Sequence, residues 1–233
     1  DWLAWRLAYV ENDRQAPGGL TSAQFAVERF ANARPENHFN GFRAVTDVVR
    51  HVGDGDEYTE YFAWAAQTRR TLHRQDPVFG TATGIRVTDD DAYNANLGVR
   101  GTQILETGGL EHELYWGLRA SQELIPDRTT VTEPLGGGAE TKLADIDFKL
   151  SALSAHVDDT LHPSEALQLT AGLRAEWVPT LEGSDHVTGE DQEDDFFDVL
   201  PGISASYELS DWSALYANYQ QSFRSPQAFG LDA

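Results

Sequence analysis

The sequence predicts an all-β fold: part of an antiparallel up-and-down transmembrane β-barrel with about nine strands. The first observation is strict alternation. In residues 167–177, Leu, Ala or Trp occupies every second position, and Gln, Thr, Gly, Arg and Glu fill the gaps. Such a strand has one apolar and one polar face. The second observation is that short turns and long polar stretches alternate along the chain. Transmembrane barrels have short periplasmic turns and long extracellular loops, whereas a soluble sandwich has no reason to gather long loops at one end.

Each strand is placed by the same period of two. The segments that fit are residues 2–10, 41–52, 58–73, 93–103, 110–123, 146–157, 165–178, 197–209 and 212–224. Tight turns are expected at 53–56, 105–109, 162–164 and 210–211, and long loops at about 11–40, 74–92, 124–142 and 179–196. Pro201 cannot donate to a ladder, so its strand is expected to begin or bulge there. A change of apolar phase near Ala152 predicts another bulge, and residues 21–30 predict a short helix.

Composition excludes several function classes. The chain of 233 residues has 17 Lys and Arg against 38 Asp and Glu, and its net charge of −21 argues against a nucleic-acid partner. Because it contains no Cys, it has neither thiolate metal ligands nor thiol nucleophiles. The longest apolar run, Tyr61–Ala66, is far shorter than the roughly 20 residues of a membrane helix. Scattered histidines and the lack of a G-x-S-x-G elbow give no support to an enzyme.

Two segments carry a resemblance to a known family. Leu200–Tyr219, continued by Ser222–Pro226, resembles the hairpin found late in TonB-dependent outer-membrane receptors. Gln15–Thr21, followed by Ala23–Phe25 and by Arg34 and Pro35, is similar to an extracellular loop of the ferric-citrate-receptor-like branch of that family. The resemblance implies a barrel of about 22 strands with an N-terminal plug inside it. It also implies active uptake of a ferric siderophore or similar iron chelate across the bacterial outer membrane.

The resemblance implies partners as well. They are the ferric chelate, outer-membrane lipid and lipopolysaccharide, and the TonB complex, which would supply the energy. Iron would be cargo, and no cofactor is expected. No plug or TonB box is recognisable in the sequence, and Met is absent. Residues 1–233 are therefore expected to be part of the barrel domain of a longer receptor, with TonB contacted through its N-terminal region.

The strand phases assign candidate ligand-binding residues. If the long loops are extracellular, polar faces line the lumen, because a charge at the lipid-facing midplane costs roughly 2–4 kcal/mol. The lumenal arginines are then Arg6, Arg43, Arg69, Arg100, Arg119, Arg174 and Arg224, joined by Gln67, His73, Tyr115, Tyr216, Asn218 and Gln220. The predicted ligand-binding set in the outer half is Arg43, Arg69, His73, Arg119, Arg174 and Arg224. Guanidinium groups bind carboxylates in bidentate fashion, which suits an anionic ferric chelate.

Alternatives stay open for these residues. The arginines could instead pair with the inward carboxylates of Glu111, Glu113, Glu123 and Glu176, or brace a plug. The acidic run Glu190–Asp195 is interpreted as a solvated loop, with a calcium site as the alternative. The aromatic residues assigned to the lipid-facing phase are Trp5, Tyr9, Trp64, Trp116, Trp177, Tyr207, Tyr219 and Phe223.

Other function classes also remain. A passive porin or adhesin-type barrel would need no plug, and a soluble β-rich carbohydrate-binding or hydrolytic domain would bury the same aromatic residues in a core. A plug upstream of Asp1 would favour the receptor over the porin. Extraction from outer membranes by detergent would favour either barrel over the soluble domain.

Overall fold

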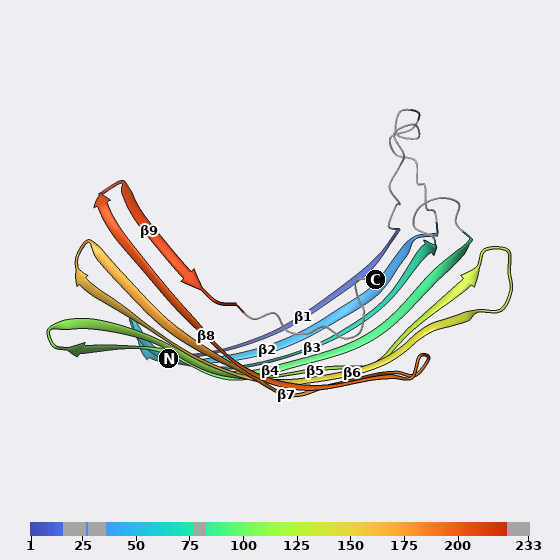
Figure 1. The fold of residues 1–233 in the computed structure, drawn as a ribbon, viewed down its shortest axis with the longest axis horizontal. Helices are drawn as coiled ribbons and strands as arrows, with labels where there is room; N and C mark the ends of the chain where they lie inside the picture. Colours follow the sequence, from blue (N-terminus) through green and yellow to red (C-terminus); the bar gives the residue numbers. More distant parts are fainter. Residues whose placement is uncertain (16–26, 28–35, 77–82, 223–233) are drawn as a thin grey trace.

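The fold is one antiparallel sheet. The computed structural model describes residues 1–15, 27, 36–76 and 83–222. Their nine strands are ordered β1 to β9, each paired with the next. The strands are β1 (Trp2–Gln15), β2 (His38–Asp54), β3 (Glu57–Asp76), β4 (Gly84–Thr107), β5 (Leu110–Pro134), β6 (Thr141–Ser164), β7 (Leu167–Asp185), β8 (Glu190–Ser210) and β9 (Ser213–Gln220). Figure 1 shows them as a single curved sheet of long strands. The predicted all-β, up-and-down architecture is confirmed.

Three of the four tight turns overlap the predicted stretches, while the one predicted at 162–164 lies at 165–166 because β6 continues to Ser164. Residues between β2 and β3, β4 and β5, β6 and β7, and β8 and β9 form short connections at one end of the sheet, here called the short-turn end. Gly108 and Gly109 show why these turns are rich in glycine: their φ angles are 63° and 80°. Two successive positive φ values match the type I′ turn that follows strand twist. No helix of the described part of the chain is long and apolar enough to cross a membrane.

The opposite end corrects the prediction of long loops. There β4 begins at Gly84, β5 continues to Pro134, β7 continues to Asp185 and β8 begins at Glu190. Most of the polar stretches at 74–92, 124–142 and 179–196 are therefore paired strand, and this end is here called the long-hairpin end. The ladder satisfies main-chain groups whatever the side chains are, so polarity alone does not end a strand. The helix predicted at 21–30 lies outside the described residues, apart from Val27.

The register separates two faces. Directly paired residues lie on the same face of the sheet, and successive residues along a strand lie on opposite faces. On one face Trp116 pairs with Val157, which pairs with Leu173. This apolar face is strongly exposed, with Trp5 at 69% and Phe197 at 65%. It is here called the outer face. Most of the aromatic residues assigned to the lipid-facing phase lie on it: Trp5, Tyr9, Trp116, Trp177, Tyr207 and Tyr219. Phe223 lies outside the described residues.

The inner face is mostly polar, but it contains one apolar cluster. Ile125, Phe148, Leu150, Val178 and Leu181 are buried together, with Ala92, Ala152 and Phe196 packed against them. The cluster lies where the register shifts between β5 and β6, β6 and β7, and β7 and β8. It therefore holds together the strands that carry the long hairpins.

The register between β6 and β7 shifts between Ser151 and Leu153, which confirms the irregularity predicted near Ala152. The extra residue lies in β7, since Ser151 and Leu153 pair with Thr180 and Trp177 while Ala152 pairs regularly with Ser121 on β5. The change of apolar phase reflects the inner cluster rather than a break in β6. The prediction for Pro201 needs correction. Pro201 lies inside β8, paired with Leu173. Its carbonyl accepts a hydrogen bond from the Gln221 main-chain N–H, on the β9 side where regular pairing ends. The missing N–H of proline therefore faces the end of the β8–β9 ladder and leaves the pairing of β8 with β7 intact.

Candidate functional site

The side chains of β3 lie on the faces opposite to those predicted. Trp64 pairs with Asp47 on β2 and Asn96 on β4, on the inner face. Trp64 was expected to face lipid. Because it lies on the inner face, every residue of β3 lies on the face opposite to the one predicted. Arg69 pairs with Phe42 and Asp91, and His73 with His38, on the outer face together with Gln67. Both faces of β3 are apolar near its middle, so hydropathy does not choose between them.

The remaining candidates that the structure describes lie on the inner face. Arg43 pairs with Val10 and Thr68, Arg119 with Gly98 and Ser154, and Arg174 with His156 and Leu200. Arg6, Arg100, Tyr115, Tyr216, Asn218 and Gln220 share this face. Arg224 lies outside the described residues. The candidates come from separate strands and heights, so they do not form one compact site.

Some of these arginines are neutralised within the wall. The Arg6 Nε lies 2.7 Å from the Asp47 Oδ1, and the Arg100 Nη2 lies 2.8 Å from the Glu60 Oε2. Arg174 forms an ion pair with Glu176, as the alternative interpretation expected. Within the described ranges, Arg43 and Arg119 form no ion pair with a carboxylate. These two guanidinium groups remain available to a ligand in the lumen.

A larger group of arginines lies near the long-hairpin end. The inner-face arginines of β1 to β5 there are Arg14, Arg43, Arg70, Arg74, Arg86 and Arg128, here called the arginine patch. Sequence reasoning missed most of it because Arg74, Arg86 and Arg128 fell in predicted loops and Arg70 had the wrong phase. Arg70, Leu72 and Arg74 occupy alternate positions. Extending the predicted strand beyond His73 would have placed Arg70 and Arg74 on the same face, and this was the signal that could have found the patch.

Asp90 organises the centre of the patch. Its Oδ2 lies 2.6 Å from the Arg70 Nη2 and 3.1 Å from the Arg128 Nη2. The Asp90 and Arg128 side chains are only 3% and 6% exposed. The Arg128 Nε and Nη1 are buried and have no hydrogen-bond partner among the described residues. Buried guanidinium nitrogens are normally satisfied, so these two N–H groups of Arg128 are an exception within the described residues.

At the height of the arginine patch, positive side chains lie on the inner face of β3 to β5 and carboxylates gather on the outer face. The outer-face carboxylates at the height of the patch include Asp89, Asp91, Asp127 and Asp147. Arg69 donates from Nε and Nη2 to the two oxygens of Asp91, at 2.9 and 2.6 Å. The acidic net charge of the chain is therefore compatible with a basic stretch of the inner face on β3 to β5, while the inner face of β7 and β8 carries carboxylates such as Asp185 and Asp194.

The acidic run is strand rather than loop. Glu190–Asp195 opens β8, where Glu193 pairs with Glu182 and Asp194 with Leu181. Lys149 lies 3.7 Å from Glu182 and partly offsets that like-charge pair. Over the described part of the chain, no group of three or more His, Asp or Glu side chains is placed to hold a metal ion.

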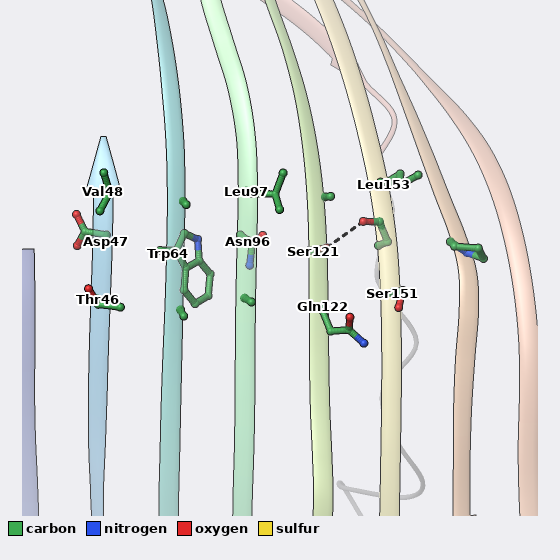
Figure 2. Close-up of a pocket in the computed structure, with 16 residues that line it drawn as sticks. Thr46, Asp47, Val48, Trp64, Asn96, Leu97, Ser121, Gln122, Ser151 and Leu153 are labelled. Atoms are coloured by element: carbon green, nitrogen blue, oxygen red, sulfur yellow. Dashed lines mark hydrogen bonds between the residues drawn. The ribbon is translucent and has the colours of Figure 1, made fainter. Parts of the chain in front are cut away.

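Cavities occur on both faces. On the inner face, a cavity of about 420 Å³ is lined by Arg6, Arg43, Val45, Asp47, Val49, Phe62, Ala63, Trp64 and Arg100. On the outer face, a shallow groove of about 630 Å³ crosses β2 to β6. Figure 2 shows Val48, Leu97 and Leu153 among the side chains along it. Small residues such as Ala65 and Ala95 leave the groove open, and its apolar lining is compatible with lipid chains.

An antiparallel meander of long strands with one apolar, exposed face and one more polar face is typical of the wall of a membrane β-barrel. Residues 3–233 match the family described as TonB dependent receptor-like, beta-barrel. The chain therefore belongs to this family, as the resemblance predicted.

Solved structures show the same fold. The unliganded ferric citrate transporter FecA shares 21% identity with a TM-score of 0.82, covering 94% of this chain and 33% of that protein. The ferric-catecholate import receptor Fiu from E. coli K12, in its open form, shares 13% with a TM-score of 0.71, covering 96% and 44%. The siderophore receptor PiuA from Acinetobacter baumannii shares 12% with a TM-score of 0.70, covering 94% and 39%. This chain thus spans less than half of each.

Proposed function

We propose that the protein acts as a TonB-dependent receptor of the bacterial outer membrane that takes up a ferric chelate bearing carboxylate groups. Family membership and the iron-chelate receptors among its structural neighbours support this proposal. Iron would travel as part of the chelate, so the chain needs no metal ligands of its own. Transport, not catalysis, is the activity proposed.

The arginine patch is the observation that carries the proposal. It lies on the inner face near the long-hairpin end, and we take the long hairpins to be extracellular, where a ligand would enter a barrel. Arg70 and Arg128 share the single carboxylate of Asp90, so their cluster keeps a net positive charge. Citrate-type chelates present several carboxylates, which match guanidinium groups in bidentate geometry.

Other inner-face arginines extend the proposed contacts. Arg43 and Arg119 have no carboxylate partner in the described ranges, while Arg174 is held by Glu176. We therefore expect Arg43 and Arg119 to contribute more to anion binding than Arg174. Arg69 and His73 are not part of the proposed site, because they lie on the outer face.

Binding of ferric citrate to the full-length receptor in detergent tests the proposal. Arg128→Gln and Arg70→Gln are each expected to weaken binding about tenfold or more, the value of a charged hydrogen bond. Arg69→Gln is the matched control, since Arg69 is the neighbour of Arg70 on the opposite face. Equal affinities for the Arg70 and Arg69 variants would contradict the proposed site.

Iron uptake by cells separates active from passive transport. The receptor is expected to import radiolabelled ferric citrate only when TonB and the proton gradient are intact. Uptake that continues without TonB would favour the passive porin. A protein that fractionates as a soluble monomer would contradict the membrane location.

A further inference from the structure

The groove of about 630 Å³ on the outer face, here called the outer groove, does not depend on how the barrel closes. Further barrel strands would pair at the β1 and β9 edges, and a plug would lie on the inner face. The groove crosses β2 to β6, between those edges. Four strand spacings of about 4.8 Å give it a length of about 19 Å, which suits an extended fatty acyl chain.

The lining of the outer groove changes from apolar to polar toward the long-hairpin end. The row of directly paired residues nearer the short-turn end is apolar: Val48, Ala63, Leu97, Ala120 and Leu153. The next row includes Gln122 and Ser151, which Figure 2 shows on neighbouring strands. Gln122 is exposed and makes no hydrogen bond with any described residue. Because hydrocarbon holds no water to satisfy an amide, Gln122 is suited to a polar group of a lipid.

Charged side chains follow this polar row in a definite order on the outer face. Lys149 is two residues beyond Ser151 on β6, and Asp147 is two residues further, next to Asp127 on β5. Toward the long-hairpin end, the surface therefore presents an apolar groove, an amide, a cation and two carboxylates. A diacyl lipid with a phosphoethanolamine head group presents its acyl chain, ester carbonyl, phosphate and ammonium group in the same order.

The two carboxylates have little positive charge near them. Asp127 is exposed and forms no ion pair within the described ranges. It pairs across the ladder with Asp91, and like charges directly opposite each other repel. Asp91 is already bound by Arg69, and Asp147 lies 2.7 Å from His186. An ammonium group beside Asp127 and Asp147 would relieve this repulsion.

We propose that the outer groove and this charged rim bind one membrane lipid with a phosphoethanolamine head group. An acyl chain lies along the groove, and the Gln122 amide donates to the ester carbonyl. The phosphate binds Lys149, whose Nζ is 3.7 Å from Glu182 and so beyond hydrogen-bond distance of it. The ammonium group donates to Asp127 and Asp147. This site is separate from cargo uptake, because the arginine patch lies on the opposite face.

Native mass spectrometry of the full-length receptor in detergent, titrated with lipids of identical acyl chains, tests the proposal. Phosphatidylethanolamine is expected to bind at one discrete site about threefold to tenfold more tightly than phosphatidylglycerol, which has the phosphate but no ammonium group. Phosphatidylcholine keeps the positive charge but has no N–H to donate, so its affinity should be intermediate. Equal affinities for phosphatidylethanolamine and phosphatidylglycerol would overturn the proposal without any substitution in the protein.

Substitutions in the charged rim test the head-group contacts. Asp127→Asn combined with Asp147→Asn should lower the affinity for phosphatidylethanolamine to that for phosphatidylglycerol. Asp159→Asn is the matched control, since Asp159 is on the outer face of β6 toward the short-turn end. Lys149→Gln should weaken both lipids, because both carry the phosphate. A double variant that keeps the preference, or an Asp159 variant that loses it equally, would contradict the assigned contacts.

Substitutions in the groove test the contacts of the chain and the ester. Ala95→Leu fills the groove and should weaken both lipids about threefold or more, whereas Ala171→Leu, on the outer face of β7 outside the groove, should not. Gln122→Leu should weaken phosphatidylethanolamine about threefold and leave its diether analogue, which has no ester carbonyl, unchanged. Equal effects of the two alanine substitutions would refute the chain site. Ferric citrate binding should be unchanged in all these variants, so lipid and cargo results can be told apart.

Discussion

Asp90→Asn is expected to destabilise the protein much more than Asp91→Asn, although the two residues are neighbours on β4. The Asp90 side chain is 3% exposed and its partner Arg128 is 6% exposed. Removing one member of a buried pair leaves the other charge uncompensated, at a cost of about 3–5 kcal/mol. Asp91, 21% exposed, pairs on the outer face with an Arg69 side chain that is 62% exposed. Such a surface pair contributes about 0.2–1 kcal/mol. The expected difference is therefore about 2–4 kcal/mol.

Denaturant unfolding of the full-length receptor in detergent micelles, followed by tryptophan fluorescence, measures this difference. A free energy of unfolding for Asp90→Asn within about 1 kcal/mol of that for Asp91→Asn would refute the buried ion-pair argument. The double substitution Asp90→Leu with Arg128→Met provides a further check. It should recover much of the loss, because it leaves no buried charge without a partner.

Further predictions concern stability and pH. Leu181→Ala should lower the free energy of unfolding by about 2–5 kcal/mol, because Leu181 is 0% exposed in the inner cluster; Leu173→Ala on the outer face should cost less, and unfolding in micelles compares them. The Val187 main-chain N–H donates to Asp185 at 2.9 Å and lowers the pKa of that carboxyl below its usual 3.8. The stabilisation from this carboxylate is therefore complete above pH 3.8 and lost as pH falls through the lower folded pKa. The protection factors for hydrogen exchange at the β7–β8 tip, which compare each rate with the intrinsic rate at the same pH, should fall in acid, and Asp185→Asn should remove that pH dependence. Leu118→Arg on the outer face should reduce stability by about 2–4 kcal/mol in membranes, measured by refolding into vesicles.

Alternation alone predicted most of the fold. A period of two identified the strands, and glycine-rich turns identified the connections, because both signals depend on neighbouring residues. The strand ends were not predictable in this way. Residues such as Thr129 and Asp191 are polar, yet they pair regularly at the long-hairpin end. Their main-chain hydrogen bonds depend on a partner strand that is distant in sequence.

The candidate site was predicted in part. Arg43, Arg119 and Arg174 were placed on the inner face because their strands have one clearly apolar phase. Arg69 was misplaced because Trp64 seemed to mark the lipid-facing phase of β3, whereas the structure directs Trp64 inward. Cross-strand charge pairs occur on both faces of that strand, Glu60 with Arg100 on the inner face and Arg69 with Asp91 on the outer face. Those pairs are known only once the register is known.

The sequence by itself determined the class of fold, the number and order of strands and the family, because alternation, turn chemistry and local motifs are properties of short segments. Only the tertiary structure decided which arginines share a wall. Arg70 and Arg128 are far apart in the chain, yet both bind Asp90 through the register of three strands. A one-residue change of register moves a side chain to the opposite face, and long-range strand pairing fixes that register.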